Sequence, residues 1–123
     1  MNEPVRPRVV ALLLVSMVAV GCHSSPAAPP PCSNPTSTSS VDLRDYAFAP
    51  TCIASTSGAT LTLHNTGKVI HNFTLDGHDL QRQVAPGDSA TVTLPSLPPG
   101  LYRVVCTLHE SVGMVAALKI SGG

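Results

Sequence analysis

From residue 41 onward, apolar and polar side chains alternate in short runs separated by turn residues. A period of two is the pattern of β-strands. It predicts strands over residues 41–48, around Ile53, and over residues 60–65, 70–75, 89–94, 100–106 and 114–120. The dividers are rich in Gly, Pro, Asn and Asp, as in tight turns, and no window has the period of an amphipathic helix. We therefore expect an all-β domain, a Greek-key sandwich or barrel of seven or eight antiparallel strands.

The alternation also indicates which side chains point toward the core. His71 shares a face with Phe73, and Cys106 shares a face with Val104. His71 and Cys106 are therefore both expected on the core side and can converge at one end of it. The same pattern points His64 outward.

The first 40 residues lack this pattern. Arg6 and Arg8 precede an apolar run over residues 9–20, which has the length of a signal-peptide core and falls short of the roughly 20 residues that span a bilayer. The following Gly21 and Cys22 resemble the end of a bacterial lipoprotein signal, in which the cysteine is lipidated. We expect residues 1–21 to be a signal peptide and Cys22 to anchor an exported protein at the cell membrane, on a periplasmic or outer surface. Simple secretion, or a disulfide at Cys22, remains the alternative.

Residues 22–40 are rich in proline and serine, the composition of an extended tether. A single folded domain is then expected over residues 41–123. Seven basic residues balance seven acidic ones, so a nucleic-acid partner is not expected.

The four cysteines narrow the chemistry. If Cys22 carries lipid, one of the other three has no partner within the domain. Cys32 and Cys52 are spaced for a disulfide that would join the entry segment to the sheet. Cys106 is then a buried thiol in an oxidising compartment, and something should occupy it.

One short stretch, residues 104–114, suggests what occupies the Cys106 thiol. Cys106, His109 and Met114 lie in one loop, and His71 lies on a separate core-facing strand. A thiolate, two imidazoles and a weak thioether are the ligands of a mononuclear blue-copper site. Exported proteins rarely keep an odd cysteine, so the joint occurrence indicates copper.

At this point the chain resembles the cupredoxin family, most closely its plastocyanin-like members, over about residues 41–120. The resemblance rests on "YAFAP", "NTGKVIHNF", "PPGLYRVVC" and "CTLHESVGM". It implies one type 1 copper ion bound by His71, Cys106, His109 and Met114. It also implies that Asn72 braces the ligand loop by hydrogen bonding near Thr107.

The chain departs from plant-type plastocyanins beside the ligands. Leu108 stands where many relatives have proline, Val105 stands where they have tyrosine, and no acidic docking cluster is present. We expect electrons to pass instead through the exposed edge of His109. The uncharged residues around it, Val112, Gly113 and Pro86, suit weak, transient docking of a redox donor and acceptor.

Other functional interpretations lack residues that their chemistry requires. No serine lies in a nucleophile turn, Glu110 has no second carboxylate near it in sequence, and a binuclear oxidase-type copper centre needs a second cysteine where Glu110 stands. His23, His64 and His78 are not expected to be ligands.

We predict no enzyme but a monomeric, lipid-anchored carrier of single electrons at the membrane surface. The alternative is a copper storage, delivery or sensing module, although Met-rich and His-rich tracts that would favour delivery are absent.

Overall fold

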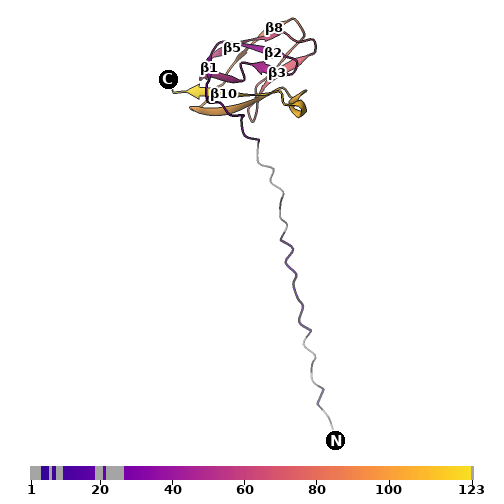
Figure 1. Ribbon diagram of the computed structural model, residues 1–123. Coiled ribbons are helices and arrows are strands. Elements are labelled where there is room, and N and C mark those ends of the chain that lie inside the picture. Colours follow the sequence, from indigo (N-terminus) through magenta and orange to yellow (C-terminus); the bar gives the residue numbers. More distant parts are fainter. Residues whose placement is uncertain (1–3, 6, 8–9, 19–20, 22–26, 123) are drawn as a thin grey trace.

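Strands make up nearly all of the regular structure in the computed structural model, which describes residues 4–5, 7, 10–18, 21 and 27–122 (Figure 1). The elements are β1 (Thr36–Ser37), β2 (Ser40–Arg44), β3 (Ala47–Ala49), β4 (Cys52–Thr56), β5 (Thr60–Asn65), β6 (His71–Leu75), β7 (Gln81–Val84), β8 (Ser89–Thr93), β9 (Gly100–Val105), a 3-10 turn η1 (Glu110–Val112) and β10 (Val115–Ser121). The predicted all-β class is confirmed.

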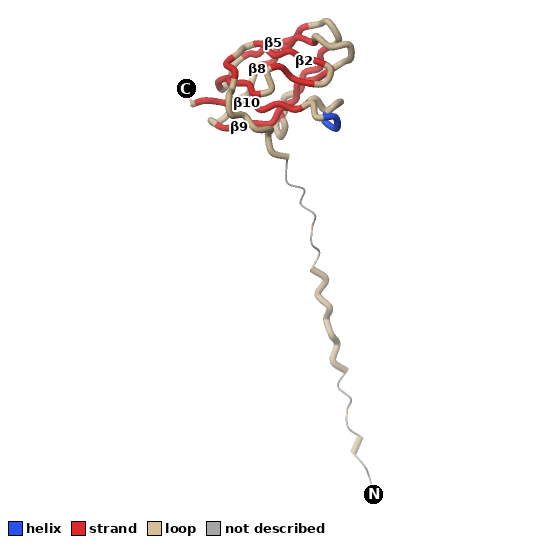
Figure 2. The backbone as a smooth tube through the Cα atoms, viewed as in Figure 1, coloured by secondary structure: helices blue, strands red, loops and turns tan. Residues whose placement is uncertain are grey.

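The strands form two sheets that pack as a sandwich. One sheet has six strands in the order β1-β4-β10-β9-β6-β7, and the other has four in the order β3-β2-β5-β8. Neighbours that are far apart in the sequence, such as β6 beside β9, mark the crossovers expected of a Greek key. The 3-10 turn lies at the opposite end of the domain from the C-terminus (Figure 2).

Besides β1, which lies within the predicted tether, three details differ from the sequence prediction. The run over residues 41–48 is two strands, β2 and β3, which pair with each other around a turn at Asp45 and Tyr46. Strand β7 was not predicted because its first three residues are polar and exposed, so it shows no alternation. The sandwich is not wholly antiparallel, since β4 pairs in parallel with β1 and β10, and β2 with β5.

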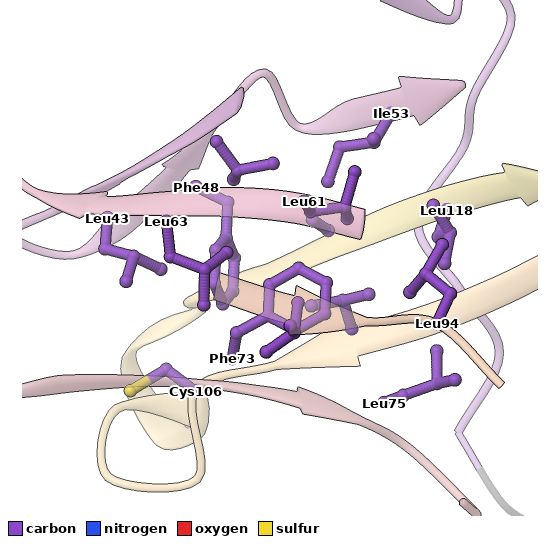
Figure 3. Close-up of a cluster of buried hydrophobic side chains, with 14 of the residues drawn as sticks. Leu43, Phe48, Ile53, Leu61, Leu63, Phe73, Leu75, Leu94, Cys106 and Leu118 are labelled. Carbon is purple, nitrogen blue, oxygen red and sulfur yellow. The ribbon is translucent and has the colours of Figure 1, made fainter. Parts of the chain in front are cut away.

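The core lies between the two sheets, where the inward side chains of both meet. Phe48 from β3 and Phe73 from β6 pack edge to face with ring centroids 6.0 Å apart, the preferred geometry of an aromatic pair. Cys106 lies at one end of this cluster, and its sulfur points away from the other labelled side chains (Figure 3). His64 is half-buried beside the fully buried Leu63, so it lies off the core face, as predicted.

The described residues before position 32 form no strand or helix and extend away from the sandwich (Figure 1). No helix in the described part of the chain is long and apolar enough to cross a membrane. Cys22 lies outside the described residues, so its predicted lipidation stays a prediction. The last part of the predicted tether over residues 22–40 belongs to the folded domain instead, because β1 pairs with β4.

A disulfide joins Cys32 to Cys52, with Cα atoms 5.2 Å apart. It ties the incoming chain to the first residue of β4. Cys32 also lines a shallow groove with Gly100, the first residue of β9, and Ile120, near the end of β10. The chain therefore joins the domain on the flank of the six-stranded sheet, beside β4, where Cys52 pairs with Ala117 of β10.

We predict that replacing Cys32 and Cys52 together by serine leaves the fold intact but lowers the free energy of unfolding by about 3 kcal/mol, because the unfolded chain regains the entropy of an open loop. Urea unfolding of the wild-type and double-serine proteins measures the difference. Reduced wild-type protein is the matched control and should unfold like the double variant. Equal stability of oxidised wild type and variant would contradict the prediction.

Candidate metal centre

The ligand loop begins where β9 and β10 separate. Register places Val105 opposite Val115, so Cys106 and Met114 face each other one step further on. The Cys106 N–H donates to the Met114 carbonyl at 3.1 Å, which closes the loop at its base. Both side chains are fully buried.

Within the loop, the backbone turns tightly around His109. The His109 N–H donates to the Cys106 carbonyl at 3.0 Å, and the His109 carbonyl accepts from Met114 at 3.2 Å. Gly113 ends the 3-10 turn with φ of 90°, a left-handed conformation that glycine adopts without strain. The loop is thus held by its own hydrogen bonds.

Three predicted ligand side chains converge. The ligand atoms of His71, Cys106 and His109 all lie within 4.8 Å of one another. The Nδ1 atoms of His71 and His109 are 3.2 Å apart, and Cys106 Sγ lies 3.5 Å from Nδ1 of His109 and 4.0 Å from Nδ1 of His71. Met114 is buried at the base of the same loop. A soft thiolate between two imidazoles suits copper.

Asn72 links the two parts of the site. Its side-chain amide donates to Thr107 Oγ1 at 2.8 Å and its carbonyl oxygen accepts from the Thr107 N–H at 3.0 Å. The Asn72 backbone N–H points at Cys106 Sγ, 3.4 Å away. These are the contacts expected of a residue that holds the cysteine in place.

Arg103 forms a second brace, which no sequence motif indicates. Its guanidinium donates to Asp76 Oδ2 at 3.0 Å and to Glu110 Oε1 at 2.8 Å. The Arg103 side chain is 12% exposed, so both ion pairs are partly shielded from water. Glu110 belongs to the 3-10 turn, and its carboxylate is directed to Arg103 rather than to the ligand cluster. The clustered candidate metal ligands are therefore His71, Cys106 and His109.

A carboxylate on the far side of His71 was also missed. Asp45 Oδ1 lies 2.7 Å from His71 Nε2, and Oδ2 accepts from the Lys68 N–H at 2.7 Å. The pKa of Asp45 is held below its ordinary value, first by the hydrogen bond from the Lys68 N–H; desolvation opposes this, while hydrogen bonds from His71 and the Val69 N–H add to it. Asp45 is 26 residues before His71, and no motif spacing connects them.

His109 lies nearest the surface among the converging ligands, and exposed apolar groups adjoin it. The Tyr46 ring packs against the His109 ring with centroids 4.8 Å apart. Tyr46, Leu108 and Val112 are 48%, 50% and 65% exposed. Val112 was predicted to be part of this surface because it is close to His109 in the sequence, whereas Tyr46 lies 63 positions before His109 and was not predicted.

Comparison with known proteins agrees with this geometry. The sequence model of the cupredoxin-like domain matches residues 10–117. This chain belongs to the cupredoxin-like family. Among solved structures, it is similar to a pseudoazurin from Sinorhizobium, with a TM-score of 0.51 and 26% identity over 68% of this chain and 72% of that one.

Two further cupredoxin structures share the fold. A purple cupredoxin from Nitrosopumilus maritimus has a TM-score of 0.55 and 18% identity, over 67% of this chain and 98% of its own. Auracyanin B has a TM-score of 0.55 and 21% identity, over 72% of this chain and 91% of its own.

Among curated sequences, two forms of cytochrome c oxidase subunit 2 from Thermus thermophilus are 30% identical over 69 residues, or 55% of this chain. The chain matches 51% of the length of one and 41% of the other. It therefore spans about half or less of the curated relatives it matches.

We predict that Asn72→Ala lowers the free energy of unfolding of the metal-free protein by about 1–3 kcal/mol, because partners of a buried amide lose their hydrogen bonds. Denaturant unfolding measures the change. Asn34→Ala, at an exposed position, is the control and should change stability by less than about 0.5 kcal/mol. Equal effects of the two substitutions would show that Asn72 is no brace.

We also predict that Arg103→Leu loosens the 3-10 turn, because Glu110 loses its partner. Leucine still fills the position on the strand, so the effect comes from the lost ion pair. Hydrogen exchange of the Val112 and Gly113 amides, which donate within this turn, should become faster. Arg44→Leu, which breaks the longer 3.8 Å pair to Asp42 on the other sheet, is the control. Unchanged exchange at both amides in Arg103→Leu would count against the brace.

Proposed function

We propose that this cupredoxin is a mononuclear blue-copper protein that carries single electrons between redox partners at a membrane surface. The observation that carries the proposal is the convergence of Cys106 Sγ with the Nδ1 atoms of His71 and His109. Copper bound there would supply one-electron redox chemistry. Met114, buried at the base of the loop, would contribute its thioether sulfur as a weak further ligand.

The protonation pattern supports cation binding. An ionised carboxylate can only accept hydrogen bonds, so the 2.7 Å contact with Asp45 assigns the proton of His71 to Nε2. His71 Nδ1 then presents a lone pair toward Cys106 and His109. A buried thiol beside this lone pair is a donor set that favours a soft cation.

The rigidity of the site supports the carrier role. His71 is on a central strand, the loop is closed between Cys106 and Met114, and Asn72 and Arg103 brace it from two sides. Groups that are already held in place move little when the charge of a bound ion changes. Small rearrangement means a low barrier to electron transfer.

A single copper ion fits better than a binuclear centre. A second thiolate would be needed, and Cys32 and Cys52 are bonded to each other. Glu110, where that thiolate would stand, is paired with Arg103. The proposed role is therefore a carrier rather than the oxidase subunit that the Thermus thermophilus relatives are named for.

Docking and localisation extend the proposal. Tyr46, Leu108 and Val112 offer a small apolar surface beside His109, suited to brief contact with a redox donor and acceptor. The disulfide favours an oxidising compartment. Lipid at Cys22 would hold the monomeric domain at the membrane.

The test is the colour of the copper-loaded protein. We expect an intense visible thiolate-to-copper band and reversible one-electron voltammetry from the wild type, and loss of the band in Cys106→Ser, since serine offers no thiolate. Cys32→Ser/Cys52→Ser is the matched control and should stay blue, because these sulfurs lie outside the cluster. A colourless wild type that takes up Cu(I) and releases it to an acceptor would indicate copper storage or delivery instead.

A further inference from the structure

The Asp45 carboxylate is built into the rear of the site. It reaches from the turn between β2 and β3, on the four-stranded sheet, to His71 on the six-stranded sheet. One oxygen receives His71 Nε2–H at 2.7 Å, and the other receives the Lys68 N–H at 2.7 Å. With both oxygens engaged by different segments, the orientation of the carboxylate is fixed.

Gly67 leaves room for this carboxylate because it has no side chain. A Cβ atom at position 67 would overlap Asp45 Oδ1, and would lie 2.7 Å from Asp45 Cγ and 3.0 Å from His71 Nε2. Gly67 does not have a positive φ, so the need for glycine here comes from space rather than from backbone conformation. Any larger residue would push the carboxylate off the imidazole.

Asn65 fixes the loop that carries Gly67. Its side-chain amide donates to the carbonyls of Val69 and Val84, both at 2.9 Å, and its carbonyl oxygen accepts from the Gly67 N–H at 2.9 Å. Asn65 is 2% exposed. The loop that supplies the donors to Asp45 is therefore anchored in the core and does not adapt freely.

The chemistry of this contact is specific. A carboxylate that accepts a hydrogen bond from Nε2–H fixes the tautomer of an imidazole and makes its other nitrogen a stronger electron-pair donor to a metal. It also leaves a negative charge one imidazole ring behind the site, which favours the more highly charged ion. Both effects stabilise Cu(II) relative to Cu(I).

We propose that Asp45 is a positioning residue that holds His71 with Nδ1 free for the metal and lowers the reduction potential of the bound copper. Gly67 is the residue that makes the contact possible. The effect on potential rests on the proposed copper function. The tautomer of His71 does not, because it is a property of the metal-free chain.

The experiment compares four proteins with the wild type. Asp45→Asn removes the charge, Gly67→Ala keeps the charge but displaces it, and the double variant combines the two. Asp42→Asn is the control, since Asp42 lies on β2, which leads into the turn that carries Asp45, and its side chain is 38% exposed beside Arg44. The readouts are the ¹⁵N shifts of His71 in the metal-free proteins and the reduction potentials of the copper-loaded proteins.

We expect wild-type His71 to be a single Nε2–H tautomer, and Asp45→Asn and Gly67→Ala to be mixtures of tautomers. Loss of a metal-supporting hydrogen bond typically changes affinity by about tenfold or more. A tenfold fall in the ratio of Cu(II) to Cu(I) affinity raises the potential by about 59 mV for one electron. The double variant should exceed the larger single effect only slightly, because both substitutions break one contact.

Two results would overturn the proposal: the same His71 tautomer in all five proteins, or a potential in Asp45→Asn and Gly67→Ala no higher than in Asp42→Asn. If Asp45→Asn does not fold, Gly67→Ala decides by the same two readouts. A wild type that binds no copper overturns the proposed function and the effect on potential with it. The His71 tautomer in metal-free Gly67→Ala then still supports or refutes the orienting role.

Discussion

The structure of the site depends on the backbone pairing of Cys106 with Met114. Because β9 and β10 are antiparallel neighbours, this pair sets the width of the loop between them and places a thiol and a thioether at its base. β6 lies on the other side of β9, so His71 approaches the same thiol laterally. A shift of one residue in the register of β10 would turn Met114 to the other face. The ligand geometry is therefore a consequence of sheet register.

Around this pairing, polar contacts hold the ligands from three directions. Asn72 connects β6 to the first residue of the loop, Arg103 connects β9 to the 3-10 turn, and Asp45 connects the second sheet to His71. The first two join parts of the same sheet. Asp45 alone of the three crosses the sandwich, so the position of His71 is coupled to how the two sheets pack. That coupling gives the packing of the core a role in positioning His71.

Much of this was accessible from the sequence. Period-two alternation found most strands, and the placement of His71 and Cys106 on inward faces followed from the same pattern. Strand β7 was missed because an edge strand with polar residues on both faces has no alternation, and the parallel pairings were missed because alternation does not encode strand direction. Asp45 and Arg103 could not be found, since their partners are set by which strands become neighbours. Gly67 could not be told from the other glycines between strands, because the space it leaves for the Asp45 carboxylate depends on a segment 22 residues away.

The disulfide determines from which side the domain is held. Cys52, the partner of Cys32, pairs with Ala117 in the first half of β10, three positions after Met114. The covalent link therefore lies near the edge strand β1, on the flank of the six-stranded sheet, and not at the end opposite the ligand loop. In a protein anchored through residues before Cys32, the sandwich would be suspended by that flank, with the loop carried to one side of the attachment point. The length of the Pro-rich segment would then set the height above the lipid at which a partner could reach the loop.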